Sequence, residues 1–151
     1  MRIVLQNVLN ASLTIEGNEV AKINRGFVLL VGFTSGDDEN TVLAMLKKVL
    51  SLRTFQDENG HTNLALEDIC GEVLSVSQFT LYGDVKKGRR PSFVNALEPT
   101  RAKELYEFWF EELHKVYPSS CSGVFGADMK VSLINDGPFT LILDSKEVLG
   151  K

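Results

Sequence analysis

The chain has few of the residues that build metal sites, disulfides or histidine-based active sites. Its two cysteines, Cys70 and Cys121, lie far apart and outside any C-x-x-C pattern, and its two histidines are His61 and His114. This set cannot supply a tetrahedral zinc site of the usual ligand spacing, so we predict no metal and no other cofactor. A disulfide is also not expected in a reducing compartment.

The sequence also lacks membrane-spanning runs and a strong net charge. No apolar stretch approaches the roughly 20 residues that a transmembrane helix needs, and the N-terminus has no signal-peptide pattern. We therefore expect a soluble, cytoplasmic protein with no membrane partner. The net charge of −4 argues against a protein that wraps nucleic acid over its whole surface, but it leaves room for a local basic strip.

The 151 residues, 44% of them hydrophobic, suit one domain, 1–151, with a single core. Roughly eight strands and two long helices are predicted from apolar periodicity. The strands include 2–8, 12–15, 20–23, 27–31, 73–81, 130–134 and 139–143, with a turn at 135–138, and the helices begin near residues 39 and 99. Because the strands cluster, the pattern favours an α+β fold with mixed or antiparallel sheet and a barrel-like core.

The most cationic segment is a loop that follows the strand at 73–81. Residues 83–90 have the glycine spacing of a phosphate-binding P-loop, but Arg89 and Arg90 replace its Lys and Ser/Thr, and Pro91 hinders the required helix. We reject the P-loop. Four cations remain that either meet phosphates or form a solvated loop: Lys86, Lys87, Arg89 and Arg90.

No common hydrolase motif is present, and both histidines are expected at the surface. Acyl-transfer chemistry would therefore depend on hydroxyls and backbone N–H groups. The best candidate is Ser77-Gln78-Phe79-Thr80, at the end of an apolar strand beside the cationic loop. A strand end can direct consecutive N–H groups at an oxyanion. The alternative is that threonine simply suits a strand.

Gly137-Pro138 offers a different kind of group. X-Pro bonds are cis in only about 5–6% of folded cases, so the ordinary expectation is a trans turn. In the cis form, two adjacent carbonyls would be held rigidly on a loop. Such carbonyls could bind a substrate amino group without any side chain.

Three ordered motifs have a spacing that points to one family. They are Ser77-Gln78-Phe79-Thr80-Leu81-Tyr82, Lys87-Gly88-Arg89-Arg90-Pro91-Ser92-Phe93 and Asn135-Asp136-Gly137-Pro138-Phe139-Thr140. These residues resemble the D-aminoacyl-tRNA deacylase family, long called D-tyrosyl-tRNA deacylase, and the resemblance spans the whole chain. It implies a homodimer of barrel-like α+β subunits that hydrolyses the ester between a D-amino acid and the 3′ end of tRNA.

The same resemblance implies roles for individual residues. The segment from Ser77 to Thr80 lines the active site, with Phe79 and Thr80 at the catalytic positions. The Gly137-Pro138 bond is cis and reaches into the partner subunit's site. Substrate contacts are assigned to Ser77, Gln78, Gly137, Pro138 and Met129, and tRNA phosphate contacts to Lys86, Lys87, Arg89 and Arg90.

Two positions depart from the family pattern. Asn7 stands where arginine is usual after the first glutamine, in a position that implies a polar contact near the site. Phe139 follows Pro138 where valine is common. The bulkier phenylalanine ring is expected to change the shape of the loop, and the glycine-proline pair is retained.

The resemblance also suggests how handedness is read. Rigid main-chain atoms can fix the amino group and leave no room where an L side chain would project. Glycine has no side chain to exclude, so glycyl-tRNA, including glycine mischarged on tRNA(Ala), is expected to be cut. We favour attack by water on the ester, with N–H groups near Phe79 and Thr80 holding the oxyanion and the ribose 2′-hydroxyl assisting. Thr80 as a nucleophile is the alternative, although no base is evident for it.

Two other function classes stay open. A non-catalytic RNA-binding domain can occupy the same fold, since fold does not fix function. A conventional serine or cysteine hydrolase would need His61 or His114 beside Ser77 or Cys121.

Overall fold

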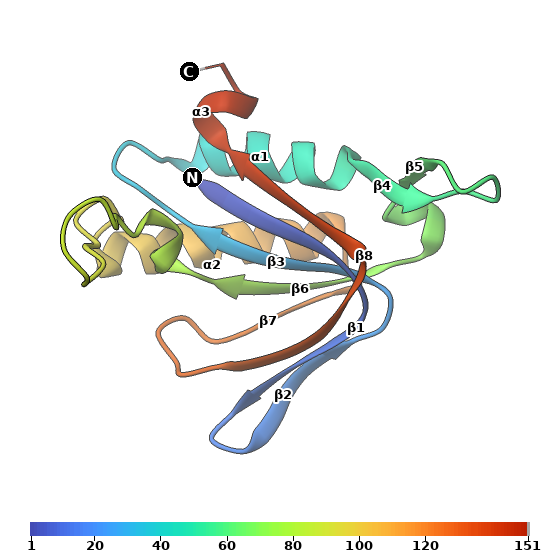
Figure 1. Cartoon of the computed structure of the whole chain (residues 1–151), viewed down its shortest axis with the longest axis horizontal. Coiled ribbons are helices and arrows are strands. Elements are labelled where there is room, and N and C mark those ends of the chain that lie inside the picture. The colour runs from blue at the N-terminus through green and yellow to red at the C-terminus, as the bar shows by residue number, and fades with distance from the viewer. Residues whose placement is uncertain (151) are drawn as a thin grey trace.

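The computed structural model describes residues 1–150 and shows a curled six-stranded sheet with two long helices (Figure 1). The strands are β1 (Arg2–Ile15), β2 (Asn18–Ile23), β3 (Gly26–Gly32), β4 (Arg53–Gln56), β5 (Thr62–Ala65), β6 (Glu72–Ser77), β7 (Ser120–Ser122) and β8 (Lys130–Asp144). The helices are α1 (Glu39–Ser51), α2 (Pro99–Val116) and the short α3 (Ser145–Val148), with 3₁₀ turns η1 (Glu67–Ile69) and η2 (Phe79–Tyr82). The α+β fold with a barrel-like core and two long helices is confirmed.

β1 is the strand that organises the sheet. Along one edge it pairs antiparallel with β8 over most of its length. Along its other edge, the first half of β1 pairs with β3 and the second half pairs with β2. β3, β6 and β7 continue the sheet in parallel. The sheet is therefore mixed, and β2 and the first half of β8 curl away from the helices with the second half of β1 (Figure 1).

The two faces of the sheet bury two separate apolar clusters. On the helix side, Phe27 and Leu29 of β3 pack with residues of α1 and α2, including Trp109, which is fully buried. On the barrel side, Val28 of β3 packs with Leu74 of β6. Alternation along the strands produces this division, because successive side chains point to opposite faces.

Both long helices begin at the residues that the sequence predicts. Asp38 caps α1, and its carboxylate accepts a hydrogen bond from the Thr41 N–H at 2.8 Å. Pro99 is in the first turn of α2, where its missing N–H costs nothing. No helix within residues 1–150 has the length and apolar character needed to cross a bilayer.

The predicted strand at 73–81 is wrong in its second half. β6 ends at Ser77, and Phe79–Tyr82 forms the 3₁₀ turn η2. The Gln78 N–H still donates to the Val31 carbonyl at 2.7 Å, but β3 ends one residue later at Gly32. With no partner strand beyond that point, the chain has nothing to pair with and turns.

The predicted turn at 135–138 is also wrong. β8 continues in one direction through these residues. Asn135 lies opposite Val8 and Thr140 lies opposite Gln6, so the four residues between them face Asn7 alone. The segment 136–139, which we call the β8 bulge, is therefore an insertion in an unbroken strand.

Candidate active site

An apolar pocket of about 730 Å³ opens where β6 ends, between the loop before α2 and the segment that leads into β8. The structure brings four predicted site residues together in its lining: Ser77, Gln78, Phe79 and Met129. Other walls come from Phe93, Val94, Leu97, Pro99, Ala102 and Phe125. The pocket is shaped for a mainly apolar group with a few polar atoms at its edge.

Glycines allow the walls of the pocket to approach closely. A Cβ added at Gly32 would lie 2.7 Å from the Gln78 carbonyl oxygen, so glycine at the end of β3 lets η2 pack against it. A Cβ added at Gly123 would collide with the sulfur of Met129. The position of Met129 against the pocket therefore depends on a glycine from the segment after β7.

Thr80 lies beside the pocket rather than in its lining. Its side chain is exposed, and its hydroxyl accepts a hydrogen bond from Gln78 Nε2 at 2.6 Å. Phe79 is 54% exposed, and its ring meets that of Phe93 edge-on with centroids 5.0 Å apart. The segment 77–80 thus presents a hydroxyl, an amide and an aromatic ring at one rim.

The backbone N–H groups of Phe79 and Thr80 lie at the start of η2. They are the first two of η2, and the first N–H groups of a helix have no acceptor within it. Within residues 1–150 neither group has a hydrogen-bond partner. Two free N–H groups at the rim of a pocket can stabilise a developing oxyanion.

Neither histidine lines the pocket. His61 is exposed in the β4–β5 turn, and Nδ1 of His114 lies 3.1 Å from the Ser120 hydroxyl at the outer end of α2. Burial raises the pKa of the Cys121 thiol, which disfavours the reactive thiolate. The serine or cysteine hydrolase hypothesis therefore lacks the histidine pairing that it requires.

Gly137 and Pro138 do not line this pocket. The bond between them is cis, so the ordinary expectation of a trans bond is wrong and the expectation from the family resemblance is met. Both residues are exposed on the β8 bulge. Since β8 is paired on one edge with β1, its other edge is open over the described residues.

Asn135 holds the base of the β8 bulge, a role that the sequence analysis missed. Its side-chain oxygen accepts from the Phe139 N–H at 2.7 Å, and its Nδ2 donates to the Thr140 hydroxyl at 2.8 Å. Asn135 lies in one of the motifs that carry the resemblance. Its two hydrogen bonds join residues on either side of the bulge, so the sequence could have indicated them only if the bulge had been predicted.

The structure shows the surroundings of Asn7 and Phe139, the two residues that depart from the family pattern. Asn7 is buried opposite the β8 bulge, where its Nδ2 donates to the Thr54 carbonyl at 2.9 Å and its Oδ1 accepts from the Thr54 hydroxyl at 3.0 Å. Phe139 is half-buried. Asn7 therefore connects β1 to β4 on the helix side of the sheet, and within residues 1–150 it forms no hydrogen bond with the glycine-proline pair.

The cationic loop lies next to the pocket. Its base is closed by an antiparallel bridge between Asp84 and Ser92, and Phe93, the next residue, lines the pocket. Its four cations are exposed and form no ion pair within residues 1–150: Lys86, Lys87, Arg89 and Arg90. Within the same residues, no group of three His, Cys, Asp or Glu side chains is placed to hold a metal ion.

Comparison with known proteins gives the family. The family described as D-Tyr-tRNA(Tyr) deacylase matches residues 4–144. A D-aminoacyl-tRNA deacylase of Lactobacillus gasseri is 53% identical over 144 residues, which are 95% of this chain and 99% of the relative. One of Bacillus cytotoxicus is 51% identical over 146 residues, covering 97% and 100%. A solved structure titled c-Myc DNA Unwinding Element Binding Protein is 39% identical, with a TM-score of 0.90 over 95% of this chain and 98% of its own. The chain belongs to the D-Tyr-tRNA(Tyr) deacylase family, as the three motifs predict.

Proposed function

We propose that this protein hydrolyses the ester bond of D-aminoacyl-tRNA and releases the free D-amino acid and the tRNA. The observation that carries the proposal is the near full-length identity of about half to relatives named D-aminoacyl-tRNA deacylase. We propose further that residues 1–151 act as one deacylase domain in the cytoplasm, where aminoacylated tRNA is found.

The first part of the proposal concerns how the substrate lies. The aminoacyl group enters the apolar pocket, with Ser77 and Gln78 at its polar rim and Met129 against its wall. The 3′ end of the tRNA approaches over the exposed loop, whose four cations meet its phosphates: Lys86, Lys87, Arg89 and Arg90. The apolar lining suits many side chains, because it offers few polar groups that select among them.

The second part concerns handedness. Two copies of the chain form a dimer in which the β8 bulge of one subunit enters the pocket of the other, and the carbonyls around Gly137 and Pro138 hold the amino group. Three features of β8 support this arrangement: one edge of the strand has no partner strand within residues 1–150, Ile134 and Ile142 are 51% and 74% exposed, and the bulge is exposed to solvent. An open edge with apolar side chains is a surface that another chain can cover.

The third part concerns the chemical step. Water attacks the ester carbonyl, and the N–H groups of Phe79 and Thr80 stabilise the oxyanion that forms. The bond to the ribose oxygen then breaks, and that oxygen takes up the proton that the attacking water has lost, so that a free amino acid and a ribose hydroxyl result. The neighbouring 2′-hydroxyl of the terminal ribose assists by hydrogen bonding. No side-chain base is required in this scheme, which fits a pocket lined by no histidine.

Replacing Thr80 with alanine is expected to reduce kcat only modestly. The hydroxyl lies outside the pocket lining and makes one hydrogen bond, with Gln78. A hydrogen bond contributes about 0.5–1.5 kcal/mol, which corresponds to at most about tenfold in rate. Single-turnover hydrolysis of D-tyrosyl-tRNA measures the effect. Near-complete loss of turnover would instead identify the Thr80 hydroxyl as the nucleophile.

Glycyl-tRNA is expected to be a substrate, including glycine mischarged on tRNA(Ala). The proposed discrimination excludes an L side chain, and glycine has none to exclude. The measurement is release of labelled glycine beside release of D-tyrosine, with L-tyrosyl-tRNA as the control that should persist. Intact glycyl-tRNA under conditions that clear D-tyrosyl-tRNA would contradict exclusion as the basis of selectivity.

One assay separates deacylation from the competing function. A nucleic-acid-binding protein without catalysis is favoured by the exposed cationic loop and by the solved relative whose title names DNA binding. Catalytic amounts of this protein should release many equivalents of free D-tyrosine from D-tyrosyl-tRNA. Binding of the charged tRNA without release would replace the deacylase proposal with the binding one.

A further inference from the structure

A second cleft lies at the opposite end of the η2 turn from the apolar pocket. Phe79, the first residue of η2, lines the apolar pocket, whereas Tyr82, the last, lines the second cleft. This cleft has a volume of about 410 Å³ and is bounded by the start of β1, the first part of the cationic loop and α3. We call it the Arg2 cleft. A four-residue 3₁₀ turn rises about 2 Å per residue, so the two sites are close neighbours.

Arg2 is held rigidly in this cleft with part of its guanidinium unused. Its Nε donates to Asp144 Oδ2 at 2.8 Å, its Nη1 donates to the Leu81 carbonyl at 3.0 Å, and the guanidinium lies 4.6 Å from the centre of the Tyr82 ring. The Nη2 N–H groups have no partner within residues 1–150. A guanidinium fixed in this way binds an anion at a small cost in side-chain entropy.

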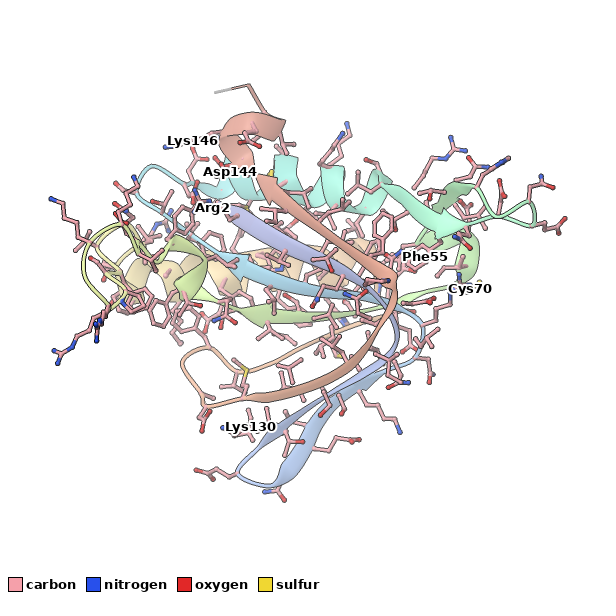
Figure 2. The ribbon with its side chains drawn as sticks, in the orientation of Figure 1. Arg2, Phe55, Cys70, Lys130, Asp144 and Lys146 are labelled. Carbon is pink, nitrogen blue, oxygen red and sulfur yellow. The ribbon has the colours of Figure 1, made fainter. Side chains whose placement is uncertain are left out.

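Two lysines add charge at the same place. Lys86 and Lys146 both line the cleft, and within residues 1–150 neither ammonium group forms an ion pair. Figure 2 shows Arg2, Asp144 and Lys146 close together where β1 begins and β8 ends. Three cations from three separate parts of the chain therefore face one polar cleft.

One carboxylate lines the cleft and a second lies beside it. Asp84 lines the cleft and accepts from the Lys86 N–H at 2.8 Å, and Asp144 is the partner of Arg2. Burial works against the charge of Asp144, but hydrogen bonds from Arg2 and from the Lys146 N–H outweigh it and lower the pKa of that carboxyl. Thr34 and Asn95 supply further polar walls. The lining of the cleft therefore holds three cations, Arg2, Lys86 and Lys146, and one carboxylate, which is a composition that binds a phosphate.

We propose that the Arg2 cleft binds a backbone phosphate of the tRNA acceptor end while the terminal ester lies in the apolar pocket. This inference rests on the proposed function, since it assigns the cleft to the same substrate. The cleft is continuous with the cationic loop through Lys86, so it extends the basic surface past η2. A strand of RNA that crosses η2 would reach both.

The test is binding of uncharged tRNA at several salt concentrations, with Lys146→Ala as the variant. Lys146 is exposed, and alanine at this position keeps the backbone N–H that donates a hydrogen bond to Asp144 Oδ1. Losing one phosphate contact should lower the slope of log K against log salt by about 0.7–1. Lys146→Arg should restore the slope, and the matched control Lys48→Ala, an exposed lysine at the end of α1, should not change it.

A second measurement ties the cleft to substrate length. The ratio of kcat/KM for D-tyrosyl-tRNA to that for D-tyrosyl-adenosine should fall in Lys146→Ala, because the short substrate has no phosphate. An unchanged salt slope together with an unchanged ratio would overturn the proposal. A second result would also overturn it. If inorganic phosphate inhibited the wild type but not Lys146→Ala, while both bound tRNA with the same affinity, the cleft would be a site for a free anion. Since binding of uncharged tRNA needs no catalysis, failure of the deacylase proposal would be recognised separately by absence of D-tyrosine release.

Discussion

Replacing Gly137 with alanine is expected to reduce deacylation at least about 100-fold while the chain still folds. Gly137 has a φ of +136°, in the region that side chains disfavour, and an added Cβ would lie 3.0 Å from the Phe139 N–H nitrogen and 3.3 Å from the Phe139 Cβ. Alanine at this position is therefore strained, and we expect the β8 bulge to shift. Displacing a positioning group by about 1 Å can cost about 100-fold in rate, and we expect at least that loss in kcat/KM for D-tyrosyl-tRNA.

The fold should survive this change because the bulge is exposed and lies outside both apolar clusters. Gly60→Ala is the matched control, since Gly60 has a φ of +76° in the β4–β5 turn and nothing within 4 Å of its added Cβ. The control introduces the same kind of backbone strain far from the site. Its thermal unfolding should resemble that of Gly137→Ala, whereas its activity should be that of the wild type. Full activity in Gly137→Ala would show that the bulge takes no part in the reaction.

Replacing Phe79 with proline is expected to reduce kcat by about 10²–10³, the usual cost of losing one oxyanion donor. The Phe79 N–H has no partner within residues 1–150, so proline removes no hydrogen bond of the fold. Phe79 is also the first residue of η2, a position at which the fixed φ of proline is tolerated. The substitution therefore removes the ring and the N–H together, and circular dichroism with thermal unfolding checks that the fold is kept.

Phe79→Ala separates the two losses, because it removes the same ring and keeps the N–H. The alanine variant loses the edge-on contact with Phe93 and an apolar wall of the pocket, so its main effect should be a higher KM. Single-turnover rates at saturating D-tyrosyl-tRNA compare the two variants directly. Equal rates for proline and alanine would show that the Phe79 N–H does not hold the oxyanion.

The sequence predicted correctly those elements that are stabilised by residues close to one another along the chain. Both long helices have caps and apolar stripes within a few residues of each other, and both begin where expected. The motif at 77–80 also contributes to the pocket as its position beside the cationic loop suggested. In each of these cases the deciding contacts lie close along the chain.

The errors occur where a distant segment decides the outcome. Residues 78–81 are apolar enough to continue a strand, but β3 ends at Gly32 and leaves them without a partner. Asn-Asp-Gly-Pro is the composition of a turn. However, the residues before and after this segment both pair with β1, and this pairing keeps β8 in one strand. Likewise, the partner of Asn7 is Thr54, which is 47 positions away. No window of neighbouring residues contains this information.

In the proposed dimer, each active site is completed by the β8 bulge of the other subunit. The direct measurement is the activity of a heterodimer that joins a Gly137→Ala subunit to a Phe79→Pro subunit, co-expressed and purified through two different C-terminal tags. One of its two sites would combine an intact pocket with an intact bulge, so the heterodimer should have about half the activity of the wild-type dimer, although each parent is inactive. A heterodimer as inactive as its parents would show that the pocket and the bulge act within one subunit, or not together at all.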